Sequence, residues 1–287
     1  MNATVYDNRV STLAEGPLWH PVRKQLFWFD ILGKKLHTRD PDGARSWELG
    51  EYGSAAGWID EDALLLATET GLHRFDIASG NRTRIADIEA NDPTMRSNDG
   101  RADPWGGFWI GTMSKTHEDG AGAFYRYYRG EVRRLFGSIS IPNATCFAHD
   151  RSYAYFGDTR SKKVMRVALD AESGWPAGEP EIYIDFSSQN VSPDGAVIDA
   201  DGLVWIAQWG GSRVAAYDAQ GTFVRDMSIS VPQVTCPAFG GEDFSTLFAT
   251  TARENMDIET IAKFSESGMV FHARGVARGM PEYQVHL

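Results

Sequence analysis

Cysteine is scarce in this 287-residue chain, which contains only Cys146 and Cys236. Each lies inside an apolar run, NATCFAH and QVTCPAF. Two thiols in such runs do not form the framework of paired cysteines that stabilises small secreted domains. Their spacing also lacks the closely spaced pairs of a structural zinc site. The sequence therefore argues against a disulfide scaffold and against a zinc module.

Long basic and long apolar runs are also missing. The formal net charge is −11 and no lysine and arginine run exceeds a few residues, which argues against a nucleic-acid-binding protein. No apolar run approaches the length of a membrane span. The N-terminal MNATVYDNRV lacks the charged and apolar regions of a signal peptide. We therefore expect a soluble, cytoplasmic protein without nucleic-acid or membrane partners, whose oligomeric state the sequence does not indicate.

Helical periodicity is rare, and the chain instead repeats a pattern of short strands. An apolar strand meets a polar turn, a second strand rich in aromatic residues follows, and a third strand comes after a loop. The first turns of the copies lie near residues 21, 61, 104, 150, 200 and 242. The resulting intervals of about 40 to 50 residues are typical of four-stranded propeller blades.

Six repeats fill the chain, so we predict an all-β fold, a six-bladed β-propeller of four-stranded antiparallel blades, as one domain over residues 1–287. The N-terminal segment TVYDNRV is expected to add a strand to the last blade and so protect its edge. Two β-sandwiches are the alternative. A sandwich does not require the same hairpin six times at near-constant spacing, which favours the propeller.

Polar residues recur just before the first strand of four repeats, where a propeller would place them at the mouth of its channel. They are Glu15, Asn98 together with Arg96, Asn143 and Asp194, whereas repeats two and six contain SAAGW and QVTCPAF. Carboxylate and amide oxygens without thiols suit a hard divalent cation. Singly, each residue also fits an ordinary turn or loop, and a salt bridge is the alternative role for Arg96. Their shared position favours a common site.

The stretch SPDGAVIDADGLVWIAQWGG contains two Asp-Gly pairs with different expected roles. Asp199 and Asp201 fall in the hairpin between two strands of one blade, so we interpret them as turn residues, with Gly202 serving the same turn. Asp194 lies one strand earlier, at the position shared by the polar residues. Gly195 is expected to let the backbone turn Asp194 toward a bound metal.

The histidines and tryptophans are expected to be structural. The seven histidines show no spacing typical of a catalytic triad or a zinc helix, and the chain lacks a Gly-x-Ser-x-Gly elbow. His20 and His149 occupy the same hairpin turn in their repeats and are expected at the surface. Trp105 and Trp209 could reach the channel mouth, but packing between blades is the favoured interpretation for them.

Five motifs run in order from about residue 14 to 254: AEGPLWHP, RSNDGRADPWGGFWIGTM, PNATCFAHD, SPDGAVIDADGLVWIAQWGGSRV and CPAFGGEDFSTLFATTAR. Together they are specific, and the chain that carries them resembles the family of senescence marker protein 30 (regucalcin), gluconolactonase and related sugar lactonases. The resemblance covers nearly the whole chain. It implies a six-bladed propeller with one divalent metal at the channel mouth.

The resemblance also implies a set of site residues. The family's metal ligands map to Glu15, Asn143 and Asp194. Its substrate-contacting residues map to Arg96, Asn98 and, on a loop of variable length, Glu118. Relatives usually read Asn-Gly where this chain reads Asn143-Ala144, a departure that concerns the local backbone rather than the ligand.

The reaction implied by the resemblance is hydrolysis of a sugar lactone, such as an aldonolactone, to the sugar acid. A divalent metal, with Ca²⁺ expected first and Zn, Mn, Mg or Fe as alternatives, would polarise the ester carbonyl and activate water. Asp194 is the expected general base and Glu15 the competing candidate. A non-catalytic calcium-binding regulatory protein is the alternative function. A WD-type interaction scaffold is disfavoured because its Gly-His and Trp-Asp signatures are missing.

Overall fold

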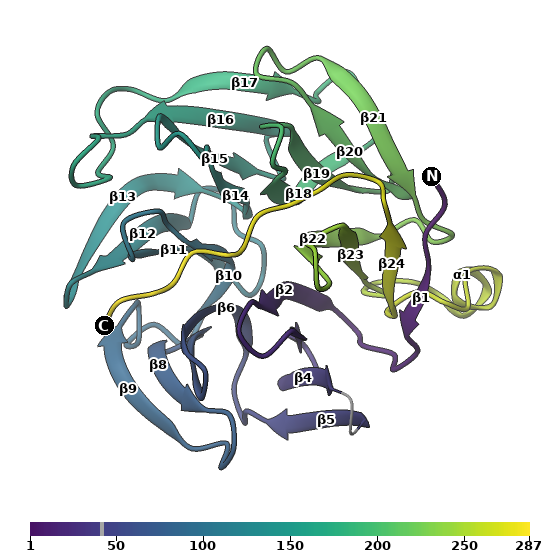
Figure 1. Cartoon of the computed structure of the whole chain (residues 1–287), viewed down its shortest axis with the longest axis horizontal. Coiled ribbons are helices and arrows are strands. Elements are labelled where there is room, and N and C mark those ends of the chain that lie inside the picture. Colours follow the sequence, from purple (N-terminus) through teal and green to yellow (C-terminus); the bar gives the residue numbers. More distant parts are fainter. Residues whose placement is uncertain (41–42) are drawn as a thin grey trace.

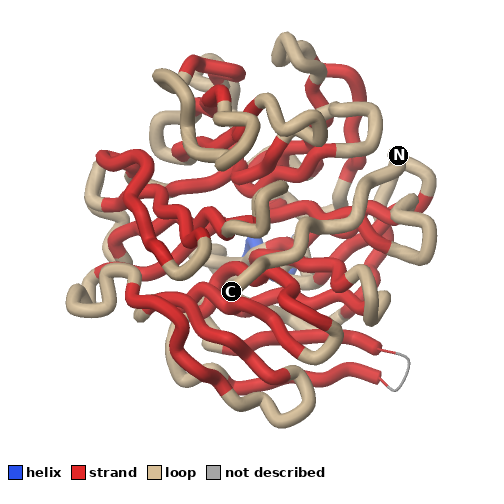
Figure 2. Tube along the Cα trace, turned by 60° about the vertical axis from the view of Figure 1, so that its left-hand side comes forward, coloured by secondary structure: helices blue, strands red, loops and turns tan. Residues whose placement is uncertain are grey.

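The computed structural model describes residues 1–40 and 43–287. These residues form six four-stranded antiparallel sheets arranged as blades around a central axis (Figure 1). In Figure 2 strands alternate with loops and turns along the chain, and the short α1 (Ile258–Lys263) precedes the last strand. Within the described residues no helix has the length and apolarity that a membrane span requires. The predicted six-bladed, four-stranded antiparallel β-propeller is confirmed.

The strands of blades 1 to 3 follow chain order from the axis outward. Blade 1 contains β2 (Ala14–His20), β3 (Gln25–Asp30), β4 (Lys35–Asp40) and β5 (Gly43–Glu48). Blade 2 contains β6 (Gly53–Asp60), β7 (Ala63–Thr68), β8 (Gly71–Asp76) and β9 (Arg82–Asp87). Blade 3 contains β10 (Met95–Ala102), β11 (Phe108–Ser114), β12 (Gly122–Tyr128) and β13 (Glu131–Ile139).

Blades 4 and 5 repeat this order, and blade 6 combines both ends of the chain. Blade 4 contains β14 (Pro142–Phe147), β15 (Tyr153–Asp158), β16 (Lys163–Ala168) and β17 (Glu181–Asp185). Blade 5 contains β18 (Ser192–Ile198), β19 (Val204–Trp209), β20 (Arg213–Tyr217) and β21 (Phe223–Ser228). Blade 6 contains β22 (Val234–Gly240), β23 (Thr246–Thr251), β24 (Val270–Arg274) and β1 (Thr4–Asp7).

The N-terminal strand closes the ring, as the sequence predicts. β1 pairs antiparallel with β24 and becomes the outermost strand of blade 6. Asp7, at the end of β1, is buried and forms an ion pair with Arg9. The guanidinium of Arg9 lies 4.7 Å from the ring centroid of Trp28 in blade 1. The residues at and after the end of β1 thereby connect blade 6 to blade 1.

The hydrophobic core lies between the blades. Each buried apolar cluster of the described residues combines side chains from two neighbouring blades. Trp28 of β3, Trp109 of β11 and Trp205 of β19 are fully buried in this packing. Because close-packed interiors resist rearrangement, this packing holds the inner strands at fixed positions around the axis.

Each innermost strand carries a β-bulge near its start. The register shifts lie at Glu15/Leu18, Gly53/Ala55, Ser97/Gly100, Asn143/Cys146, Pro193/Ala196 and Val234/Pro237. A bulge inserts an unpaired residue, bends the strand and redirects its side chains. The same irregularity in all six innermost strands reorients side chains at one end of the channel.

The C-terminal segment, residues 275–287, crosses the other face of the ring (Figure 1). The amide of Val285 donates to the carbonyl of Trp58, near the end of the inner strand of blade 2. The amide of Ala200, in the first turn of blade 5, donates to the carbonyl of Arg278. The segment therefore covers the end of the channel opposite the bulges.

His20 and His149 connect neighbouring blades. His20 is fully buried, and its Nε2 lies 2.9 Å from the carbonyl oxygen of Asp60 in blade 2. The half-buried His149 places its Nε2 3.1 Å from the carbonyl oxygen of Asp199 in blade 5. The expectation of a surface position is wrong for His20, because the turn of the next blade covers it.

The glycines of the two Asp-Gly pairs have different structural roles. Gly202 has φ +84° in its hairpin turn, as expected for a turn glycine. Gly195 does not have a positive φ, and a Cβ at this position would lie 2.2 Å from Sγ of Cys236 in blade 6. The expectation that Gly195 turns Asp194 toward a metal is therefore wrong. Gly195 allows β18 and β22 to approach closely.

We predict that Gly195→Ala lowers the thermal unfolding midpoint more than Gly202→Ala. The first substitution overpacks two buried strands, which costs about 1–3 kcal/mol or more. The second adds a methyl group with no atom within 4 Å and costs roughly 1–2 kcal/mol for its left-handed backbone alone. Unfolding followed by circular dichroism measures both. Equal shifts in the two variants would refute the role given to Gly195.

Candidate functional site

A cavity of about 500 Å³ opens at the end of the channel where the innermost strands begin. All five polar residues that share a position in the repeats line it: Glu15, Arg96, Asn98, Asn143 and Asp194. All five are buried. They come from blades 1, 3, 4 and 5, so ring closure brings together side chains that are distant in the sequence.

The bulges explain how the candidate side chains reach the cavity. Glu15 of β2 and Asn143 of β14 are the last paired residues before their bulges. Asn98 of β10 and Asp194 of β18 lie inside theirs. The sequence predicted positions just before the first strands, whereas the structure places these residues within the strands, because the ladder continues on both sides of a bulge.

Two bulges require left-handed backbone directly after a candidate ligand. Gly16 follows Glu15 with φ +53°, and Ala144 follows Asn143 with φ +57°. A residue with a Cβ costs roughly 1–2 kcal/mol in this region. Ala144 nevertheless adopts the conformation that glycine favours. The departure from the family's Asn-Gly pair therefore leaves the left-handed turn in place.

Hydrogen bonds connect the candidate residues in a chain. Arg96 Nη1 donates to Asn98 Oδ1 at 2.7 Å. Asn98 Nδ2 donates to the Pro142 carbonyl at 2.9 Å and to Asn143 Oδ1 at 3.3 Å. Asn143 Nδ2 donates to Thr159 Oγ1 at 2.7 Å. Because an amide oxygen has two lone pairs, Asn143 Oδ1 can accept from Asn98 and still bind a cation.

Glu15 and Asp194 are buried carboxyl groups surrounded by further negative charge. Burial, followed by the charge of Asp99, raises the pKa of Glu15 to about 8. Burial, followed by the charge of Glu15, raises the pKa of Asp194 well above its usual range. Burial also lowers the pKa of the Arg96 guanidinium. Two buried carboxylates that repel each other are the arrangement that a bound cation stabilises.

The donor set at the cavity fits a hard divalent cation. Glu15 and Asp194 supply carboxylate oxygens, Asn143 supplies an amide oxygen, and no thiol takes part. Within residues 1–40 and 43–287, no group of three or more His, Cys, Asp and Glu side chains is placed to hold a metal. A cation site here would therefore need the amide oxygen of Asn143 in addition to the two carboxylates.

Glu118 is placed differently from the other predicted site residues. It is exposed on the loop between β11 and β12. Among the described residues the cavity wall includes its neighbour His117 but not Glu118 itself. Its contact with a substrate stays a prediction.

The cavity wall includes further residues that the repeat pattern did not identify. Trp209 ends β19, Arg160 follows β15, and Glu254 follows β23. In an antiparallel hairpin the end of the second strand lies beside the start of the first, so these positions face the same mouth. A search of the ends of the second strands would have found them. Trp209 both packs against the cluster between blades 1 and 2 and lines the cavity, so packing alone is an incomplete account of it.

Comparisons with known proteins find a matching family model and several relatives that are similar over nearly their whole length. The family model described as SMP-30/gluconolactonase/LRE-like region matches residues 13–253. The crystal structure of a calcium-binding protein, regucalcin, from Agrobacterium tumefaciens is 38% identical, covers 100% of this chain and 99% of its own, and has a TM-score of 0.97. The 6-deoxy-6-sulfogluconolactonase of Pseudomonas putida is 34% identical over 95% of this chain and 94% of its own. The L-arabinolactonase of Azospirillum brasilense is 32% identical over 97% of this chain and 93% of its own.

We predict that, without divalent cations, Asp194→Asn is more stable than the wild type at about pH 8 to 9. Folding raises the pKa of Glu15 from 4.5 to about 8. The stability contributed by protonation of this carboxyl is therefore fully present below about pH 4.5 and is lost as the pH rises to about 8. Removing the charge of Asp194 reduces the repulsion. Thermal unfolding in EDTA from about pH 5 to 9 measures the difference.

Asp201→Asn is the control for this prediction, because Asp201 is exposed in the same stretch of sequence. It should follow the wild type at every pH. A wild type that becomes more stable than Asp194→Asn toward pH 9 would show that the two carboxylates do not repel each other.

Proposed function

The chain belongs to the SMP-30/gluconolactonase/LRE-like family and is a carboxylic ester hydrolase, and we propose that it hydrolyses a sugar lactone to the sugar acid in the channel-mouth cavity. The observation that carries the proposal is the convergence of two buried carboxylates, an amide and an adjacent Arg and Asn in one cavity. Relatives named for the hydrolysis of sugar lactones support this substrate class.

Glu15, Asn143 and Asp194 are proposed to hold one divalent cation. When bound, the cation would polarise the lactone carbonyl and lower the pKa of a water molecule. Oxygen ligands suit Ca²⁺, with Zn, Mn, Mg and Fe as alternatives. The description of the Agrobacterium relative as calcium-binding supports Ca²⁺.

Asp194 is proposed as the general base. Its carboxylate would accept a proton from water while the water oxygen bonds to the carbonyl carbon of the lactone. The bond between that carbon and the ring oxygen then breaks, and the proton passes to the ring oxygen, which becomes a hydroxyl group. Glu15 is the competing base, since a pKa of about 8 lies near neutral pH. Cation binding lowers carboxylate basicity, so the more weakly bound carboxylate is the better base.

Arg96 and Asn98 are proposed to bind the hydroxyl groups of the substrate, with Glu118 accepting others from its loop. The Nη1 of Arg96 donates to the Ser97 carbonyl and to Asn98. A guanidinium carries five N–H donors, so others can turn to a ligand. In the described part of the chain Arg96 is in no ion pair within 4.0 Å, which disfavours the salt bridge considered as its alternative role.

A non-catalytic calcium-binding regulatory protein is the second candidate function. The description of the Agrobacterium structure favours it, because that protein is called calcium-binding. It would bind a cation without turning over any lactone of a broad panel. The side chains of Arg96 and Asn98 favour the enzyme, because they add substrate-type donors beside the proposed cation ligands.

We predict that chelator-stripped protein does not hydrolyse aldonolactones and that a divalent cation restores the activity. Asp194→Asn should lower kcat/KM by about 10²-fold or more, because it loses both a ligand and a base. A pH-indicator assay with gluconolactone and arabinonolactone, corrected for spontaneous hydrolysis, measures the rates.

Asp201→Asn should keep the wild-type rate in this assay. Wild-type turnover by Asp194→Asn would remove Asp194 from the site. Activity that survives complete chelation would remove the cation from the mechanism.

A further inference from the structure

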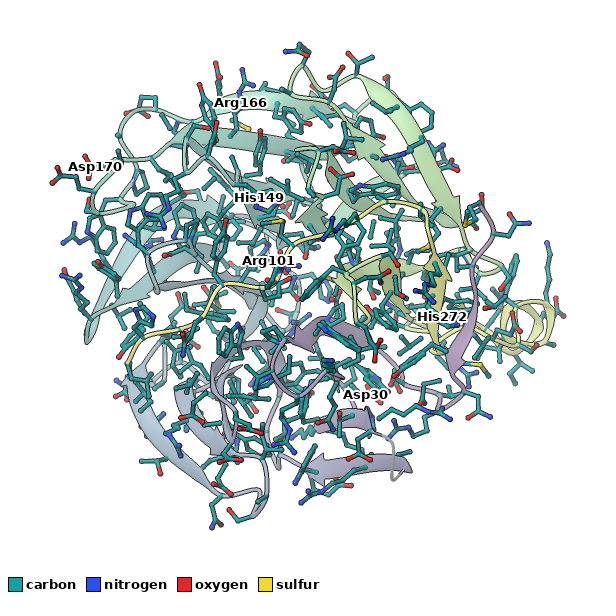
Figure 3. The ribbon with its side chains drawn as sticks, in the orientation of Figure 1. Asp30, Arg101, His149, Arg166, Asp170 and His272 are labelled. Carbon is teal, nitrogen blue, oxygen red and sulfur yellow. The ribbon has the colours of Figure 1, made fainter. Side chains whose placement is uncertain are left out.

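Arg101 occupies the centre of the ring, on strand β10. It is buried, and Figure 3 shows it where the C-terminal segment crosses the axis. Its Nη1 forms an ion pair with the carboxylate of Glu282, which belongs to that segment. Among the described residues, the lining of the channel-mouth cavity includes neither side chain. The proposed mechanism so far assigns them no role.

The guanidinium of Arg101 also donates to the backbone of three other blades. Nε donates to the carbonyl of Thr145 at 3.1 Å. Nη2 donates to the carbonyls of Ala196 at 2.9 Å and Pro237 at 3.4 Å. These carbonyls belong to the innermost strands of blades 4, 5 and 6. An innermost strand has no neighbouring strand on the side that faces the axis, so its carbonyls there lack donors from the sheet. The side chain of Arg101 supplies these donors.

Two of these carbonyls belong to residues that closely follow proposed cation ligands in the sequence. Thr145 is two residues beyond Asn143, and Ala196 is two residues beyond Asp194. Thr145 lies inside the bulge of β14, and Ala196 ends the bulge of β18. The ladder is interrupted at a bulge, so the position of its residues depends on other contacts. Arg101 provides that contact for both strands.

Asp99, also on β10, holds the other side of Thr145. Its Oδ2 accepts the Thr145 amide at 2.7 Å, while Arg101 donates to the Thr145 carbonyl. Both backbone groups of this bulge residue are therefore bound by β10. The strand of blade 3 thus determines where β14 presents Asn143.

We propose that Arg101 is a positioning residue for the cation site, holding β14 and β18 so that Asn143 and Asp194 reach one cation. Glu282 keeps the guanidinium in place by neutralising its charge, because a buried arginine without an anionic partner is strongly disfavoured. The C-terminal segment thereby supports the site from the opposite end of the channel. The inference rests on the proposed function, in which Asn143 and Asp194 bind a divalent cation.

Calcium binding by the full chain tests the inference, measured by isothermal titration calorimetry after chelator treatment. Arg101→Met removes all the hydrogen bonds of the guanidinium and should raise the Kd for Ca²⁺ at least tenfold. Arg101→Lys keeps the charge but cannot reach three carbonyls at once. Its Kd for Ca²⁺ should therefore lie between that of the wild type and that of Arg101→Met. Glu282→Gln should also raise the Kd, since the guanidinium loses its anionic partner.

Arg126→Met is the matched control. Arg126 and Asp103 form an ion pair in which both side chains are 0% exposed, away from the cavity lining. Its loss should lower the thermal midpoint at least as much as Arg101→Met but leave the Kd for Ca²⁺ unchanged. The comparison separates positioning of the ligands from a general loss of stability.

Wild-type affinity in Arg101→Met, Arg101→Lys and Glu282→Gln would overturn the inference and leave the cation site standing. Equal weakening in Arg101→Met and Arg126→Met would overturn it too, because stability alone would then explain both. A wild type that binds neither Ca²⁺ nor Mn²⁺ would remove the cation site and the inference together. If Arg101→Met does not fold, the Kd values of Arg101→Lys and Glu282→Gln are compared with that of the control Arg126→Met instead.

Discussion

The axial edges of the innermost strands are the constraint on which the rest of the molecule depends. Ring closure brings six such edges together, and their buried carbonyls require hydrogen-bond donors. Side chains supply them: Asn98 donates to the Pro142 carbonyl and Thr159 Oγ1 to the Pro193 carbonyl. Arg101 does the same for three strands. Polar residues in the channel therefore hold the innermost strands together, whether or not they also bind a ligand.

The same closure concentrates negative charge at the channel mouth. Glu15 comes from blade 1 and Asp194 from blade 5, and ring closure brings them close enough that, after burial, the charge of Glu15 raises the pKa of Asp194. The packed interfaces between blades hold this repulsive arrangement in place. Functional sites commonly lower the stability of the fold in this way. A cation between the carboxylates would offset the repulsion and supply an electrophile at one point.

The repeat spacing was sufficient to predict six blades, the closing N-terminal strand and five polar residues that converge on one cavity. These features depend on periodicity within the chain. Contacts between blades were not predictable from it: the turn that buries His20, and the approach of Cys236 that requires Gly195. Trp209 and Glu254 reach the mouth through antiparallel pairing rather than through the repeat position searched. The catalytic and ligand roles themselves stay predictions.

A crystal grown with Mn²⁺, with diffraction recorded at the manganese absorption edge, tests the central claim most directly. The account predicts an anomalous peak in the channel-mouth cavity, within about 2.5 Å of carboxylate oxygens of Glu15 and Asp194 and the amide oxygen of Asn143. A lactone-hydrolysing protein with no peak at this position, or with its peak bound by other residues, would contradict the account.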